Sequence, residues 1–260
     1  MRSSDLLCSL IDGLYLCFHS ASQMETEQII IEIREELTQC SHASTREAGE
    51  RFFKEAVRFY GVKNAVVHDI AKAFYKTMAG QSKQEVFDLC DTLWQSGFVE
   101  EAHIACDWAY ALRKQYVPAD FEVFERWVGQ YVHNWANCDA LSNHSIGTFI
   151  QMYPAYTAAL KSWTRADNRW MRRAAAVSFV VPAKKGQFWT DIVQVAELLL
   201  TDQDDLVQKG YGWMLKEASK PHPESVFEFV MQHKSVMPRT ALRYAIEKLP
   251  EAMRKMAMEK

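Results

Sequence analysis

The chain has 260 residues, 48% of them hydrophobic, with only 10 Gly and 7 Pro. This length can bury one sizeable core, and the scarcity of turn-forming residues favours helices over a β fold. A net charge of −3 is not that of a generic basic nucleic-acid-binding protein, and no apolar stretch is long enough to span a membrane. The six cysteines form no Cys-x-x-Cys pair and lack zinc-ligand spacing with histidines, so we expect reduced thiols, a cytoplasmic location and no metal.

Residues 1–40 predict a helical extension or cap. The apolar stretch 6–18 contains Asp12 and lacks a small-residue cleavage site, which favours a short amphipathic helix over a signal peptide. The isoleucine-rich run 29–33 lies inside a charged helical pattern and is therefore also expected to be helical.

Helical periodicity then continues along the chain. It predicts helices over 45–60, 63–78, 83–95, 99–114 and 119–132, with breaks at Gly61, Gly80, Gly97 and Pro118. Helices of this length joined by short turns predict an all-α solenoid, a superhelix of stacked antiparallel helix pairs. No low-complexity linker interrupts the pattern, so we expect residues 1–260 to form one domain.

The next predicted helix carries an aromatic residue and a carboxylate. Asn134 and Asn137 mark its start, and Trp135 and Asp139 are four residues apart, so both lie on one face of a helix. Asp139 has two interpretations. It is either an N-cap or first-turn acid that favours the helix dipole, or a functional carboxylate.

A helix predicted over 167–180 places Trp170, Ala174 and Val177 on one apolar stripe, with Arg173 at its border. A charged group at such a position must be paired or must face a wet cleft. The guanidinium of Arg173 is therefore expected either to form a salt bridge to another helix or to hold a phosphate.

A helix predicted over 203–219 carries Trp213 at the edge of its apolar stripe, above the small Gly210. A tryptophan in that position is either a core residue or the wall of a site. Lys209 and Lys216 flank it within about two turns and either face solvent or reach a phosphate backbone. The stripe itself is Val207, Tyr211, Met214 and Ala218.

Charge is divided unevenly along the chain. Residues 1–130 hold 13 Lys and Arg against 20 Asp and Glu, whereas residues 131–260 hold 17 against 13, which gives net charges of −7 and +4. A polyanion is therefore expected to bind the C-terminal half if those positive charges share a face.

Four fragments in this half are similar, in order and spacing, to the AlkD-type DNA alkylation repair glycosylases, which are built from HEAT-like helical repeats. The resemblance runs from about residue 44 to about residue 249. The fragments read NWANCDAL, ADNRWMRRAAAV, VQKGYGWMLKEASK and MPRTALRYAIEKL.

The resemblance implies roles for particular residues. Asp139 matches the family's catalytic aspartate, Trp135 the aromatic residue that precedes it, and Trp213 a wall of the lesion site. Arg173 matches a functional arginine expected to anchor a phosphate. We expect further contacts to the DNA backbone from Arg172, Lys209, Lys216, Arg239 and Arg243.

The implied activity is hydrolysis of the N-glycosidic bond of positively charged alkylated purines, 7-methylguanine and 3-methyladenine, in duplex DNA. Asp139 is expected to stabilise the oxocarbenium-like state or to orient water. The resemblance implies a monomer in the bacterial cytosol that needs no metal or organic cofactor. The alternative is a non-catalytic HEAT-like scaffold that binds a nucleic-acid structure or a protein.

Overall fold

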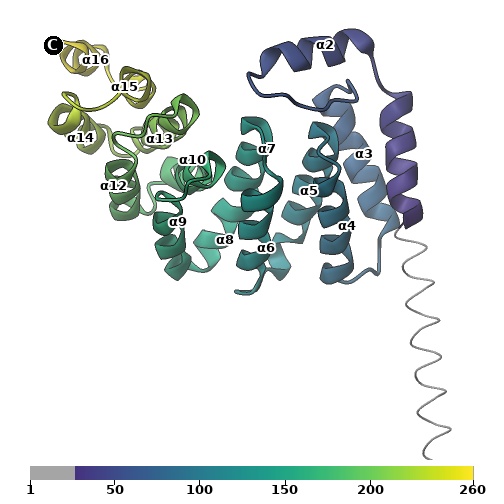
Figure 1. Ribbon diagram of the computed structural model, residues 1–260. Helices are drawn as coiled ribbons and strands as arrows, with labels where there is room; N and C mark the ends of the chain where they lie inside the picture. Colours follow the sequence, from purple (N-terminus) through teal and green to yellow (C-terminus); the bar gives the residue numbers. More distant parts are fainter. Residues whose placement is uncertain (1–26, 260) are drawn as a thin grey trace, which may run out of the picture.

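A row of packed helices forms the centre of residues 27–259, the part of the chain that the computed structural model describes (Figure 1). Each helix of this central row packs against the next one in the row. Its members are α3 (Asn64–Thr77), α5 (Val99–Ala111), α7 (Trp135–Ala140), α10 (Arg169–Val177), α13 (Asp205–Ala218) and α15 (Arg239–Ile246).

Apart from α2, the other helices pack against this row, against the short turns between its members or against one another. They are α4 (Lys83–Gln95), α6 (Asp120–Arg126), α8 (Gly147–Met152), α9 (Thr157–Trp163), α11 (Val180–Lys184), α12 (Trp189–Leu198), α14 (Pro223–His233) and α16 (Glu251–Met258). Short 3-10 helices span Leu112–Gln115 and Pro154–Tyr156, and π-helical turns span Trp127–Tyr131 and Leu141–Ile146. Residues 27–39 are also helical.

The predicted all-α solenoid is confirmed over the described residues. Figure 1 shows the row bending from the blue N-terminal helices to the yellow C-terminal ones. Residues 27–259 contain no β-strand, only an isolated parallel bridge between Arg58 and Phe98. In the same range no helix is long and apolar enough to cross a membrane. The helix predicted at 6–18 lies outside the described residues.

The apolar stripes predicted from periodicity form the core. Trp170, Ala174 and Val177 of α10 are buried, and the stripe of α13 is fully buried. Gly212 lets α13 and α15 approach closely, because a Cβ atom there would lie 2.7 Å from the Cβ of Tyr244 and 2.9 Å from the carbonyl oxygen of Ala241. This contact fixes the two C-terminal helices of the central row against each other.

The helix predicted over 45–60 is wrong beyond Phe52. Helix α2 (Ala43–Phe52) ends there, and Phe53 adopts an extended backbone. The ring of Phe53 packs against Phe59 and against Trp135 of α7 instead of continuing the helix. We call residues 43–59, which comprise α2 and this extended segment, the arm.

The base of the arm is firmly anchored. The N–H of His42 donates to the carbonyl of Gly61 (3.0 Å), and the Glu100 carboxylate accepts from the backbone N–H groups of Tyr60, Gly61 and Val62 at 3.2, 2.9 and 3.1 Å. Gly61 has a φ of 95°, in the left-handed region that favours glycine. The arm therefore leaves and rejoins the helical body at one place.

Candidate active site

Helix α7 presents Trp135 and Asp139 on one side. The side chain of Asn134 caps the helix by accepting from the N–H of Asn137 (2.9 Å), so that the helix begins at Trp135. Asp139 lies beyond the first turn, and the interpretation of it as a capping acid is wrong. Its carboxylate is thus free to act outside its own helix.

Asp139 accepts two hydrogen bonds from Arg173 of α10. The Nε–Oδ1 distance is 2.8 Å and the Nη2–Oδ2 distance is 2.7 Å, and Nη1 of Arg173 donates to the carbonyl of Leu206. Arg173 is only 6% exposed. The interhelical salt bridge, one of the two expectations for this residue, is therefore present. Protein acceptors engage three of the five guanidinium N–H groups, which leaves two for another acceptor.

Gly210 makes room for this arginine. A Cβ atom at Gly210 would lie 3.3 Å from the Cγ of Arg173. The side chain of Arg173 can therefore lie along α13 and reach from α10 to both α7 and the start of α13. One residue thus links three successive helices of the central row.

A cavity of about 470 Å³ opens beside the ion pair. Trp135, Asp139 and Arg173 line it together with Lys209 and Trp213, so the structure brings five of the predicted site residues together. Its volume lies in the range typical of small-molecule sites. The other lining residues are Phe52, Lys54, Glu55, Leu206 and Tyr244.

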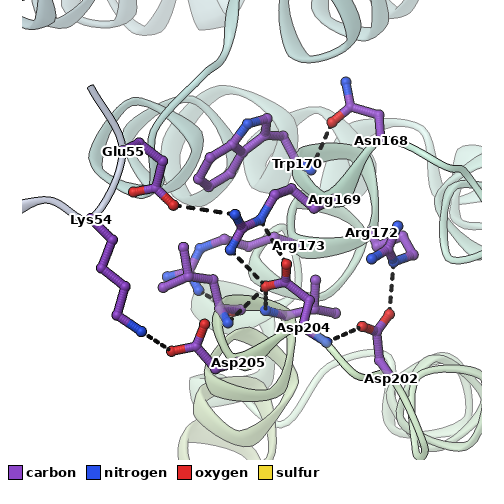
Figure 2. Close-up of polar contacts among 12 residues, drawn as sticks. Lys54, Glu55, Asn168, Arg169, Trp170, Arg172, Arg173, Asp202, Asp204 and Asp205 are labelled. Atoms are coloured by element: carbon purple, nitrogen blue, oxygen red, sulfur yellow. Dashed lines mark hydrogen bonds and ion pairs between the residues drawn. The ribbon is translucent and has the colours of Figure 1, made fainter. Parts of the chain in front are cut away.

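Residues 52–57, which we call the tip of the arm, cover part of this cavity. The ring of Phe53 stacks on Trp135, with centroids 5.3 Å apart and planes inclined by 21°, and Phe52 meets the same indole edge-on at 5.6 Å. Lys54 and Glu55 project from the arm toward α13 and α10 (Figure 2). The cavity is thus bounded by the central row and by a segment that precedes it in the chain.

The electrostatic environment of Asp139 contains two opposing effects. Burial raises the pKa of the Asp139 carboxyl, whereas the charge and hydrogen bonds of Arg173 act to lower it. The side chain of Asp139 retains 14% exposure, on the side of the cavity that it lines. The site therefore holds a carboxylate of fixed orientation beside aromatic faces, an arrangement that can stabilise developing positive charge.

The other cations predicted to bind DNA do not line this cavity. Arg172 points away from Arg173 and pairs with Asp202 at 2.7 Å (Figure 2). Lys216 pairs with Glu247 at 2.8 Å. Arg239 and Arg243 lie exposed on α15 and, among residues 27–259, have no ion-pair partner.

Five residues that line the cavity were missed at the level of sequence, and Leu206 among them is an ordinary apolar residue at the start of α13. Tyr244 lies within a fragment that carries the family resemblance, but one exposed tyrosine on a helix gives no signal of its own. Phe52, Lys54 and Glu55 were placed on a continuous helix. Two adjacent phenylalanines are a usable signal, because neighbouring helical residues point about 100° apart and one core face cannot bury both.

Neither histidine near Asp139 in the sequence lines the cavity. His133 contacts the carbonyl of Tyr131 at 2.9 Å, and His144 is exposed. Across residues 27–259 no cluster of three or more His, Cys, Asp or Glu side chains could hold a metal ion.

Comparisons with known proteins agree with one another. A family model described as DNA alkylation repair enzyme matches residues 33–249. A solved structure, a predicted DNA alkylation repair enzyme from Enterococcus faecalis, superposes with a TM-score of 0.73 at 19% sequence identity, covering 81% of this chain and 97% of that one. At this identity the superposition shows a shared fold. Among curated proteins no relative matches.

Proposed function

The chain belongs to the DNA alkylation repair enzyme family, and on that premise we propose that it is a DNA glycosylase specific for cationic alkylated purines. Its substrates would be 7-methylguanine and 3-methyladenine in duplex DNA. The observation that carries the proposal is the convergence of Asp139, Trp135 and Trp213 on one cavity. A carboxylate between aromatic faces suits a reaction whose substrate is cationic and whose transition state develops positive charge.

The alkylated base is already a good leaving group. When the bond between C1′ and the purine nitrogen breaks, the electron pair leaves with the base and cancels its positive charge. The sugar then carries oxocarbenium character until the oxygen of a water molecule bonds to C1′ and that water loses a proton. Little acid catalysis is needed, so the protein has to stabilise the sugar cation and position water.

Asp139 is the group that performs both tasks in this proposal. Arg173 holds both carboxylate oxygens at 2.7–2.8 Å, so that the negative charge is oriented before the substrate arrives. A preoriented charge in a partly buried site costs no reorganisation during the reaction. Arg173 is in this respect a positioning residue for Asp139.

The aromatic residues and the lysine serve substrate binding. Trp135 and Trp213 would contact the deoxyribose and the charged base through their π faces. Lys209, which pairs with Asp205 at 3.2 Å and whose side chain is 34% exposed, would exchange that partner for a phosphate beside the lesion. The two remaining N–H groups of Arg173 would bind another phosphate.

The rest of the duplex would lie along the C-terminal helices. Arg239 and Arg243 would contact phosphates directly, whereas Arg172 and Lys216 would first have to exchange a carboxylate partner for a phosphate. The proposed reaction uses no metal or organic cofactor, and a monomer contains the whole constellation.

Base release from methylated duplex DNA tests the proposal. The purified protein should free 7-methylguanine or 3-methyladenine, detected by chromatography and mass spectrometry, and should leave abasic sites that alkali cleaves. An Asp139→Asn variant serves as the control for contaminating activity. Binding to the duplex without release of any base would favour the non-catalytic scaffold.

A further inference from the structure

Arg169 lies near the start of α10, four residues before Arg173, and three carboxylate oxygens surround it. Its ion pairs join Nε to Oδ2 of Asp204 at 2.8 Å and Nη1 to Oε1 of Glu55 at 3.2 Å, and Nη2 donates to Oδ1 of Asp204 at 2.9 Å (Figure 2). The side chain of Arg169 is still 33% exposed. Although Arg169 faces solvent, each of its three guanidinium nitrogens thus has a carboxylate oxygen beside it.

The two acids differ in how firmly they are held. Asp204 caps α13 by accepting from the N–H groups of Leu206 (2.9 Å) and Val207 (3.3 Å), so that it is part of the helical body. Glu55 comes from the arm and lines the cavity. Of the two acids, only Glu55 belongs to the arm, and only the arm can move away from the helical body.

The tip of the arm rests on three successive helices of the central row. Phe53 stacks on Trp135 of α7, and Glu55 pairs with Arg169 of α10. Lys54 pairs with Asp205 of α13 at 2.9 Å. Together these contacts place Phe52, Lys54 and Glu55 of the arm in the lining of the cavity that Asp139 also lines.

These contacts are weak in comparison with the anchorage of the base. Helix α2 buries no residue, Phe52 is 69% exposed and the side chain of Lys54 is 74% exposed. The Lys54–Asp205 pair is exposed on both sides and contributes little to stability. The Glu55–Arg169 pair, with side chains 20% and 33% exposed, is still partly open to solvent. The base, in contrast, is held by the Glu100 carboxylate and by backbone hydrogen bonds. The tip can therefore lift while the base stays in place.

We propose that Arg169 is a binding site for a DNA backbone phosphate, and that Glu55 occupies this site until DNA displaces the tip of the arm. This inference rests on the proposed function, because it takes duplex DNA to be the ligand. A guanidinium binds carboxylate and phosphate with the same geometry, so a phosphate can replace Glu55 directly. Displacement of the tip also uncovers Trp135 for the substrate.

Affinity for an undamaged duplex tests the exchange without depending on base excision. Glu55→Gln removes the competing charge and keeps the shape of the side chain, so the duplex should bind about two- to fivefold more tightly, the range expected for one exposed ion pair. Glu50→Gln is the matched control. Glu50 is an exposed acid of α2 without an ion-pair partner among the described residues, and its removal reports the general effect of one charge.

Arg169→Gln should weaken binding, and the double variant Glu55→Gln/Arg169→Gln should bind no better than Arg169→Gln alone. That lack of additivity is the signature of competition at Arg169. If Glu55→Gln gains no more than Glu50→Gln, or if the gain persists without Arg169, the proposal is wrong. Thermal midpoints of all variants show whether a changed affinity reflects altered folding.

Hydrogen exchange of the wild-type protein gives a second readout. Addition of the same undamaged duplex should speed exchange of the backbone amides at 52–57, while the amides of 60–62 stay protected. Unchanged or slower exchange at 52–57 in the DNA-bound state would overturn the displacement of the tip. A protein that binds no duplex at all would instead contradict the proposed function, so the two failures are distinguishable.

Discussion

Asp139 and Arg173 form a two-point ion pair that joins α7 to α10, with both nitrogen–oxygen distances between 2.7 and 2.8 Å. The same carboxylate lines the cavity. The residue proposed to stabilise the sugar cation is therefore also the counter-charge of a buried arginine, and substitutions here should affect both rate and stability.

Asp139→Asn should lower single-turnover release of 7-methylguanine on the order of a hundredfold or more, because an electrostatic group that acts in the transition state is lost. The variant should also be less stable by about 3 kcal/mol, because a buried arginine loses its counter-charge. Asp139→Asn/Arg173→Gln should regain part of this stability and no activity. Excision by Asp139→Asn at the wild-type rate would contradict the catalytic assignment.

The pH dependence of excision should move when Arg173 is replaced. The proposed reaction requires ionised Asp139, so the rate should fall as the pH drops through the pKa of this carboxyl. Burial raises that pKa and Arg173 opposes the rise, so Arg173→Gln should shift the acid limb of the rate profile to higher pH. Lys209→Gln, which removes another cation of the cavity, should leave the limb in place. If the acid limb of the rate profile is unchanged in both variants, ionisation of Asp139 does not control it.

Salt should weaken binding to duplex DNA, and the exposed arginines should account for more of that effect than the paired lysine. Arg239→Gln should reduce the slope of log affinity against log salt by about one, the effect of one lost phosphate contact. Lys216→Gln should change it less, because Lys216 already has Glu247 as a partner. Titrations by fluorescence anisotropy at several salt concentrations measure both slopes. Equal slopes in Arg239→Gln and wild type would exclude Arg239 from the DNA contact.

Gly212→Ala should destabilise the fold by about 1–3 kcal/mol, the usual cost of overpacking a core. The added Cβ atom would lie 2.7 Å from the Cβ of Tyr244 and 2.9 Å from a backbone oxygen, which cannot rotate away. Gly129→Ala is the matched control, because its Cβ atom would lie 3.8 Å from the sulfur of Met171, an ordinary contact. Denaturant midpoints compare the two, and similar stabilities would show that α13 and α15 separate readily.

Local signals in the sequence predicted much of the fold. The helix expected over 83–95 coincides with α4, whose start is fixed by a capping box between Ser82 and Glu85. The buried stripes of α10 and α13 also follow from spacing alone. Each of these features depends on residues within one or two turns of each other, and sequence periodicity reports such relationships directly.

The arm and the charge pairs depend on contacts between distant segments. Phe53 leaves the helical conformation although its neighbours fit a helix, because Trp135 provides a tertiary partner for its ring. Likewise, the net positive charge of the C-terminal half gave no sign that Arg172 would be paired with Asp202, 30 residues away. The family resemblance, confirmed by the match over 33–249, pointed to Trp135, Asp139, Arg173 and Trp213, which meet at the cavity. The roles of these residues in catalysis and DNA binding remain predictions.

The hydrogen bond between His42 and Gly61 has a consequence for how such a protein can change over time. Because residues 43–60 depart from and return to a single point, their length and composition can vary without altering the register of the helices that follow. Insertions, deletions or replacement of this segment would change the lining that the arm contributes to the cavity. The lining contributed by α7, α10 and α13 would stay the same. Under the proposed function, selectivity among alkylated bases would diversify in this segment while the solenoid stays the same.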